Sequence, residues 1–430
     1  MIAMVLATLA LQAATEQAAT EQADTEQAAP ERPDLYDYPA CDLVDDMAPV
    51  GDPAYDTLAD VARMACRTGR PIDAAEAEAL LGARRFAFDA DVSAGTVTVA
   101  ARPLEGGPGA ASGALNGDLD EIGAGRYASE FRLAGLEAGM LTFYLAPHLH
   151  SAADGSDDQF RMQHWRGPSA PAMRIIEPEP AGALSDHELY SEALGETRRI
   201  AVYTPPGHDP GAGPYPAVIV ADGGKVEYYG RQLDPLITSG RLAPLVLIGL
   251  RSGQEGIVEQ KEASNSDLRN ADYLPGFSRL PGRFEPHLVF AAEEAIAWAV
   301  REFAISTDPA DLAVNGRSGG GGFAYHAGLR RPDVFGHALV HSPGWSVPGD
   351  IPPPGEAQAR FYIVAGRYET SFARAARLAH SGLRDAGYET SHIEISAGHT
   401  MEITQTTIAD QLMAIFPGEN TSPAPRDAAR

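Results

Sequence analysis

The residues between positions 314 and 322 form a pattern that could hold a nucleophile. The run reads Val314-Asn-Gly-Arg-Ser-Gly-Gly-Gly-Gly322 and places the order Gly-x-Ser-x-Gly around Ser318. A strand-like run precedes it and a helical run follows, and a serine on such a turn exposes its hydroxyl above a sheet. Gly316 and Gly320 leave room for the turn, and the helix start favours negative charge. We predict Ser318 as a nucleophile; the alternative is a glycine-rich turn that only allows close packing.

Two later residues could complete the chemistry of Ser318. Glu369 follows a strand-like run at residues 360–366, and His399 follows another that ends at residue 395. The order serine, acid, histidine is that of the strand–turn–helix nucleophile. His399 is predicted to take and return the serine proton, while Glu369 orients its ring. His392 and His341 are alternatives that we expect to be structural, and a solvated Glu369 would leave a Ser–His dyad.

An oxyanion at Ser318 would need two backbone N–H donors. Gly319, directly after the serine, is predicted to supply one. The second is expected from the loop at residues 220–225, which follows an apolar run and contains Gly223 and Gly224. Either glycine allows the backbone to approach a ligand closely.

These residues need a sheet that brings distant strand ends to one edge. From residue 185 to residue 417, short apolar runs typical of buried parallel strands alternate with helical stretches. This alternation predicts an α/β fold of the α/β-hydrolase type, with a mostly parallel sheet covered on both faces. The expected strands lie at residues 199–203, 216–221, 245–249, 312–314, 337–340, 360–364 and 392–395.

The region before this domain has a different period. Residues 84–180 contain alternating runs separated by turn residues, clearest before residue 150, and predict a small all-β sandwich. Residues 36–83 are expected to be a short helical segment, with helices at 53–67 and 73–81.

The two ends of the chain and its cysteines bear on its location. Residues 1–14 are apolar and end in small residues, which predicts a signal peptide and a periplasmic or secreted protein. Residues 15–29 repeat a polar motif, and residues 15–35 are expected to be a disordered linker. Residues 418–430 are expected to be a disordered tail. Cys41 and Cys66 predict one disulfide in an exported protein, or else two unrelated thiols.

The composition of the chain limits the classes of ligand and partner that it is expected to bind. The 430 residues carry a formal net charge of −26, which disfavours nucleic acid as a ligand. No run is long enough for a membrane span, and no Cys/His cluster has metal-ligand spacing, so neither a metal nor another cofactor is expected. The only lysines are Lys225 and Lys261, and we expect no basic cluster at the site.

Several motifs together resemble the esterase family that includes the enterochelin esterases. They are Arg198-Arg-Ile-Ala-Val-Tyr-Thr-Pro-Pro-Gly207, Asp222-Gly223, Leu242-Ala-Pro-Leu-Val-Leu-Ile-Gly249, Asn315-Gly-Arg-Ser-Gly-Gly320, Arg330-Arg-Pro-Asp-Val-Phe-Gly336 and His341-Ser-Pro-Gly344. The resemblance covers residues 185–417 and implies hydrolysis of a small-molecule carboxylic ester, in some members a catechol siderophore.

The resemblance also implies a substrate-binding segment. The family often has Arg-x-x-Glu-Tyr near its site, and here Arg269-Asn-Ala-Asp272-Tyr273 stands in that place, with Asp for Glu. Arg269 and Tyr273 are therefore expected to contact substrate, with a surface arginine as the other interpretation of Arg269. Two further functions stay open: an esterase on acylated polysaccharide, and a binding protein with a degenerate hydrolase body.

Overall fold

The computed structural model describes residues 38–47, 49, 51, 53–102, 110–115, 117–146, 162–174, 176, 179–252, 257, 266–277, 280–344 and 351–421. All of them belong to a single contact unit, Tyr38–Arg430. The predicted signal peptide and linker lie outside the described residues, as do residues 422–430 of the predicted tail. Residues 418–421 are described, and Asn420 donates its backbone N–H to Gly240 O (2.8 Å). No helix among the described residues is long and apolar enough to cross a membrane.

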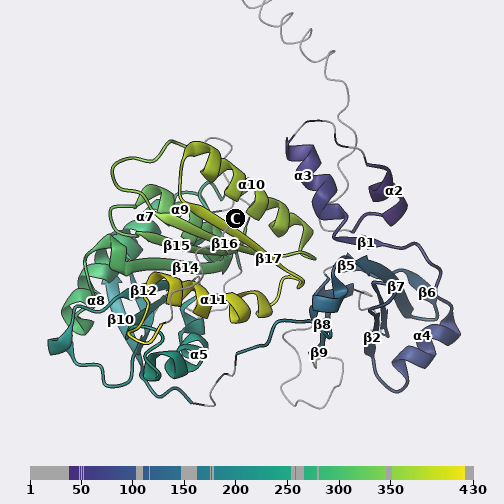
Figure 1. The fold of residues 1–430 in the computed structure, drawn as a ribbon, viewed down its shortest axis with the longest axis horizontal. Helices are drawn as coiled ribbons and strands as arrows, with labels where there is room; N and C mark the ends of the chain where they lie inside the picture. The colour runs from purple at the N-terminus through teal and green to yellow at the C-terminus, as the bar shows by residue number, and fades with distance from the viewer. Residues whose placement is uncertain are drawn as a thin grey trace, which may run out of the picture. The chain divides into compact units, whose positions relative to one another are not determined.

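The C-terminal part is built on an eight-stranded sheet in the order β10-β11-β13-β12-β14-β15-β16-β17 (Figure 1). The pairs from β13 to β17 are parallel, whereas β10–β11 and β11–β13 are antiparallel. Strand β14 is therefore an interior strand, and its carboxyl end opens onto the edge where such sheets bind ligands. The strands are β10 Ala183–Ser191, β11 Glu196–Thr204, β12 Ala217–Ala221, β13 Val246–Leu250, β14 Leu312–Ser318, β15 His337–Pro343, β16 Arg360–Gly366 and β17 Thr390–Ile395.

Helices cover both faces of this sheet. Buried side chains of α8, α9 and α10 pack with one face, and those of α5 and α11 with the other. Alternate residues of each interior strand enter the two cores, which explains their continuous apolar runs. The helices are α5 Val226–Thr238, α6 Ser266–Tyr273, α7 Phe284–Val289, the π-helix η6 Phe290–Ala295, α8 Ile296–Phe303, α9 Gly319–Arg330, α10 Thr370–Ala386 and α11 Glu402–Ile415, with short 3-10 turns η3 Pro210–Ala212, η4 Gly223–Lys225 and η7 Pro309–Asp311.

The N-terminal part contains two antiparallel sheets. One has the order β1-β7-β3-β2 with β6 paired to β7, and the other the order β5-β4-β8-β9. Phe131 of the first sheet and Phe143 of the second belong to one buried core, as expected of a sandwich. The strands are β1 Ala65–Arg67, β2 Phe86–Asp91, β3 Thr96–Ala101, β4 Ala110–Gly113, β5 Gly117–Asp118, β6 Glu121–Gly123, β7 Arg126–Leu133, β8 Met140–Ala146 and β9 Gln163–Arg166, with η1 Leu136–Ala138 between β7 and β8.

The predicted helix at residues 53–67 is too long. The structure has α2 Cys41–Asp46, α3 Pro53–Ala62 and α4 Ala74–Leu81, while residues 65–67 form β1 and pair with β7. Cys66 in β1 is bonded to Cys41 in the predicted disulfide. Sheet pairing and the disulfide together outweigh the helical spacing of the small residues in this segment.

The sandwich packs directly against the loop that follows β17. Met140 at the start of β8 donates its backbone N–H to Ser396 O (2.8 Å). A Cβ atom at Gly398 would lie 2.0 Å from Ala114 O, so only glycine fits there. The N-terminal part therefore supports the backbone immediately before His399.

Candidate active site

Ser318 occupies a sharp turn between β14 and α9. Its backbone has φ 60° and ψ −126°, a region that non-glycine residues seldom adopt. A Cβ atom at Gly316 would lie 2.1 Å from Gly320 O, so the turn can close only because residue 316 is glycine. This is the strained geometry that a nucleophile turn requires.

Glu369 and His399 meet beyond the ends of β16 and β17. His399 Nδ1 lies 2.5 Å from Glu369 Oε2, and the ring of Phe372 stacks on the imidazole at a centroid distance of 4.0 Å. Glu369 is buried, and its other oxygen accepts hydrogen bonds from Ser342 Oγ (2.5 Å) and Gly366 N–H (2.6 Å). Three donors thus stabilise the carboxylate, and the remaining imidazole nitrogen of His399 is left for proton transfer.

The sequence did not identify Ser342 or Phe372 as parts of this arrangement. Ser342 belongs to a motif noted above, but its backbone φ of 46° and its buried hydroxyl appear only in the structure. The alternative histidines are placed in strands. His341 is buried and lies 3.0 Å through Nε2 from Gln411 Oε1, and His392 stacks on His380.

The loop after β12 carries the predicted oxyanion glycines. Gly223 is buried, and a Cβ atom there would lie 2.4 Å from the backbone of Gly249. Gly224 is exposed, with open space where a Cβ atom would be. Asp222, which precedes them, has φ 58° and ψ 60°. Gly223 thus allows the loop to pack on β13, and Gly224 is the more accessible of the two.

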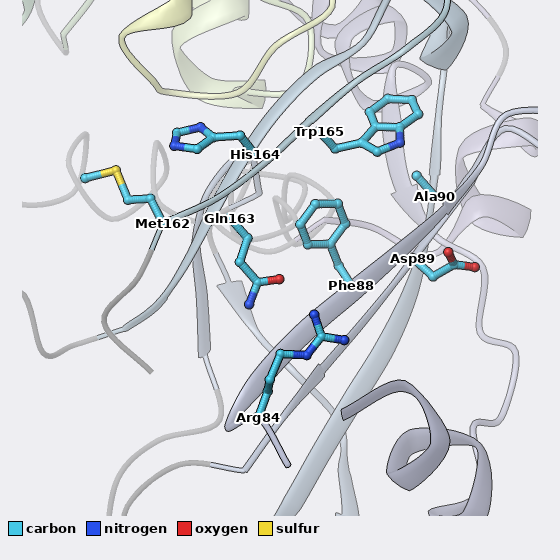
Figure 2. Close-up of a pocket in the computed structure, with 8 residues that line it drawn as sticks. All are labelled: Arg84, Phe88, Asp89, Ala90, Met162, Gln163, His164 and Trp165. Atoms are coloured by element: carbon cyan, nitrogen blue, oxygen red, sulfur yellow. The ribbon is translucent and has the colours of Figure 1, made fainter. Parts of the chain in front are cut away.

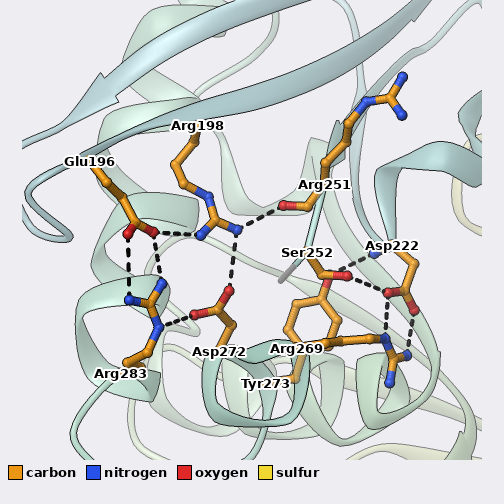
Figure 3. A network of polar contacts seen from close by, with 9 residues as sticks. All are labelled: Glu196, Arg198, Asp222, Arg251, Ser252, Arg269, Asp272, Tyr273 and Arg283. Atoms are coloured by element: carbon orange, nitrogen blue, oxygen red, sulfur yellow. Dashed lines mark hydrogen bonds and ion pairs between the residues drawn. The ribbon is translucent and has the colours of Figure 1, made fainter. Parts of the chain in front are cut away.

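Arg269 and Tyr273 of α6 hold this loop (Figure 3). Arg269 binds Asp222 in bidentate fashion, with Nε to Oδ1 at 2.6 Å and Nη2 to Oδ2 at 2.5 Å, and Ser252 Oγ donates to the same carboxylate (2.8 Å). Burial alone would raise the pKa of Asp222, but the hydrogen bonds and charge of Arg269 lower it overall. Tyr273 is fully buried, and its hydroxyl oxygen accepts the Asp222 N–H (2.7 Å).

The two residues therefore support the loop that carries Gly223 and Gly224. The Arg269 guanidinium is already paired with Asp222, and the Tyr273 ring is enclosed by protein. Their expected contact with substrate stays a prediction. Sequence reasoning missed Asp222 as their common partner, because nothing in the spacing of residues 222 and 269 indicates that they meet.

A second ion network lies beside the first (Figure 3). Asp272 and Arg198 are both fully buried and 3.2 Å apart, and Arg283 Nε donates to Asp272 (2.8 Å). Glu196 accepts hydrogen bonds from both arginines. His287 lies next to this network and has its pKa lowered to about 4, chiefly by burial. Asp272, the family motif's acidic residue, is therefore structural here.

The cavity nearest His399 has a volume of about 630 Å³. The catalytic part contributes Lys225, Arg317 and His399, and the sandwich contributes Met140 and Trp165 among others. The cavity is lined by three cationic side chains, Arg166, Lys225 and Arg317, which were not expected from the net charge.

A second hollow of about 440 Å³ lies between β2 and β9 (Figure 2). It is lined by Arg84, Phe88, Asp89, Ala90, Met162, Gln163, His164 and Trp165. None of these side chains is a hydroxyl or thiol nucleophile. Within the described residues, no group of three or more His, Cys, Asp or Glu residues could hold a metal ion.

The fold agrees with that of solved esterases of the α/β-hydrolase type. The chain is similar to the enterobactin esterase FES from Shigella flexneri, with 16% identity and a TM-score of 0.53 over 80% of this chain and 98% of that one. An enterochelin esterase structure from Shigella flexneri is 15% identical, with a TM-score of 0.52, and the match covers 77% of this chain and 95% of that one. A ferulic acid esterase from Anaeromyces mucronatus is 15% identical, with a TM-score of 0.43, and the match covers 54% of this chain and 90% of that one.

Sequence comparison places the chain in a family. The model of the family described as "Putative esterase" matches residues 191–413, which is more than half of the chain. The chain therefore belongs to this esterase family, and the predicted fold class and the resemblance to enterochelin esterases are confirmed. No protein with a curated description matches the chain in sequence.

Proposed function

We propose that this esterase is a serine carboxylic-ester hydrolase that acts through an acyl-enzyme on Ser318. The observation that carries the proposal is the contact between His399 and Glu369, which join two loops at the same sheet edge as the Ser318 turn. A buried carboxylate bound to one imidazole nitrogen is the arrangement by which a histidine becomes a directed general base.

The chemistry follows from these positions. Glu369 accepts a hydrogen bond from the Nδ1–H of His399, so the Nε2 lone pair is free to take the hydroxyl proton as Ser318 Oγ attacks the ester carbonyl. His399 then gives that proton to the departing alkoxide, and the alcohol leaves. Water repeats the sequence on the acyl-enzyme: its proton goes to His399, its oxygen to the acyl carbon, and Ser318 recovers its proton as the acid is released.

Negative charge on the carbonyl oxygen needs fixed donors during both steps. Gly319 N–H at the first turn of α9 is one candidate. Gly224, on the loop held by Asp222 and Arg269, is the favoured second donor over the buried Gly223. A loop held by a bidentate ion pair keeps its N–H groups in place as charge develops.

The substrate proposal is a small-molecule ester. The Shigella flexneri relative was solved with enterobactin, which favours a siderophore-like ester as one candidate. An ester on an acylated polysaccharide is the alternative, and export to the periplasm or outside the cell suits both.

Hydrolysis of an ester panel tests the proposal. The panel contains p-nitrophenyl acetate and butyrate, a catechol trilactone with and without iron, and a feruloyl sugar. We expect turnover by the wild type, its loss in Ser318→Ala, and its retention in Ser381→Ala, a matched change on α10. Silence of the wild type on every ester, with glycan binding intact, would favour the binding-protein alternative.

A further inference from the structure

The cavity beside His399 combines positive charge with an apolar wall. Its volume is about 630 Å³, which suits a small organic group. Of its three cations, Lys225 follows the loop glycines and Arg317 directly precedes Ser318, so these two come from segments that form the proposed site. The third, Arg166 of β9, donates a hydrogen bond to Pro171 O.

Neither Lys225 nor Arg317 forms an ion pair with any residue in the part of the chain that the structure describes. Among the described residues, the Arg317 side chain makes one long hydrogen bond, from Nη1 to His399 O (3.4 Å), out of its five possible N–H donors. Lys225 is exposed. By contrast, Arg269 forms a bidentate ion pair with Asp222 through Nε and Nη2. Two cations without carboxylate partners among the described residues, in a cavity that His399 also lines, are available to a ligand.

The acidic residue of the cavity is Glu402, and it is occupied. Its carboxylate accepts a hydrogen bond from the Thr142 hydroxyl of β8, and His164 Nδ1 of β9 lies 2.7 Å from the same hydroxyl. Glu402 is buried, at 8% exposure. It therefore joins the sandwich to α11 and is bound to a neighbour, whereas neither Lys225 nor Arg317 has a carboxylate partner among the described residues.

Methionines supply most of the apolar wall. Met140 and Met162 come from the sandwich, and Met173 and Met401 from the segments beyond it. Methionine side chains adapt to ligands of irregular shape and present little polarity. The wall thus favours an aliphatic or aromatic group rather than a polar one.

We infer that the cavity binds an ester that carries a carboxylate on an apolar group, with Arg317 and Lys225 pairing with that carboxylate. The inference rests on the proposed esterase function and names the substrate class of the same site. The carboxylate can lie on the acid side or the alcohol side of the ester, and matched substrates separate the two. The net charge of −26 would slow the approach of such an anion, whereas the local cations would hold it.

The test compares esters that differ only in charge. One pair is mono-p-nitrophenyl adipate and p-nitrophenyl hexanoate; the other is 4-carboxyphenyl acetate and phenyl acetate. We expect the wild type to prefer the anionic member of at least one pair in kcat/KM. Lys225→Met and Arg317→Met should each reduce that preference about tenfold, as expected for the loss of one charge-assisted hydrogen bond.

Control variants separate this effect from general damage. Lys225→Arg should keep the preference, and Arg384→Met, which removes an exposed cation on α10, should leave the ratio unchanged. Higher ionic strength should reduce the preference without affecting the neutral esters. Turnover of both pairs without preference for either anion would overturn the inference while the esterase proposal stands.

If the wild type turns over none of the four esters, the esterase proposal fails on these substrates. Calorimetric titration of mono-p-nitrophenyl adipate then tests the cavity by itself. Saturable binding that Lys225→Met weakens would support the anion site, and no binding would overturn it.

Discussion

Glu369 and Asp222 lie beyond strands on either side of β14, and each carboxylate is engaged by one nitrogen-rich side chain. Glu369 contacts Nδ1 of His399, an imidazole whose other nitrogen can accept a proton. Asp222 contacts Arg269, whose charge is permanent. In the proposed mechanism, the same kind of contact serves proton transfer on one side of Ser318 and loop positioning on the other.

The two carboxylates also differ in how deeply they are buried and in which groups hold them. Glu369 is almost fully enclosed and accepts two further hydrogen bonds, so the orientation of its carboxyl group is fixed. Asp222 is partly exposed, and its side chain and backbone are held by separate residues of α6. We therefore expect changes at the Glu369 side to affect the chemical step most, and changes at the Asp222 side to act through the loop.

The largest effect should come from His399→Gln. The variant removes the general base, and we expect kcat/KM for p-nitrophenyl butyrate to fall by about 10⁴-fold. His392→Gln, in the strand β17 that precedes His399, is the matched control and should retain most activity. Equal loss in both variants would show that His399 has no special role.

Glu369→Gln should have the next largest effect. The amide can still accept a hydrogen bond but cannot stabilise a protonated His399, so we expect kcat to fall by about 10²–10³-fold. KM should change little, because Glu369 is buried and has no path to substrate. Unchanged kcat would reduce the mechanism to a Ser–His dyad.

Two buried histidines near the Asp222 and Glu369 contacts, His287 and His341, make the free energy of unfolding depend on pH. His287 contacts Tyr273 and His341 precedes Ser342, and burial lowers the pKa of each to about 4. The unfolded chain binds these protons near pH 6.5, so unfolding takes up protons between pH 6.5 and 4. The free energy of unfolding is therefore unaffected by the titration of these two histidines above pH 6.5. It decreases between pH 6.5 and 4, by up to roughly 3 kcal/mol for each histidine.

Urea denaturation at several pH values measures this contribution. His287→Phe should flatten the decrease in unfolding free energy between pH 6.5 and 4, whereas His187→Phe should leave the slope unchanged. A wild-type curve that is flat over this range would contradict the buried neutral state of both histidines.

Arg269→Gln should have the smallest effect on activity. Loss of the bidentate pair loosens the loop with Gly224, and we expect kcat to fall about tenfold, within the range expected for a weakened oxyanion donor. Arg269→Lys should recover part of the loss. A double-mutant cycle with Asp222→Asn should give strong coupling, and additive losses would exclude the ion pair as the cause.

The sequence predicted the hydrolase sheet well because its interior strands are buried on both faces. Runs such as residues 216–221 have no polar alternation and lie next to clear helical faces. The order of Ser318, Glu369 and His399 then followed from strand order. The helix at 53–67 failed because pairing of β1 with β7 and the disulfide are long-range constraints that local spacing does not contain.

The supporting residues were the least predictable part of the site. Asp222 and Arg269 are 47 residues apart, and Glu369 and Ser342 are 27 apart, so only the folded chain brings them together. The cavity beside His399 could not be predicted from the sequence for the same reason. Its cations and its methionine wall come from segments of both halves of the chain, and composition alone suggested an acidic surface without a basic site.

The most direct test of the mechanism is covalent labelling of the nucleophile. The protein is treated with diethyl p-nitrophenyl phosphate, and its mass and tryptic peptides are then measured. The mechanism predicts one diethylphosphoryl group per chain, located on Ser318, with slow labelling in His399→Gln and none in Ser318→Ala. A wild type that stays unlabelled, or a label on another residue that persists in Ser318→Ala, would contradict it.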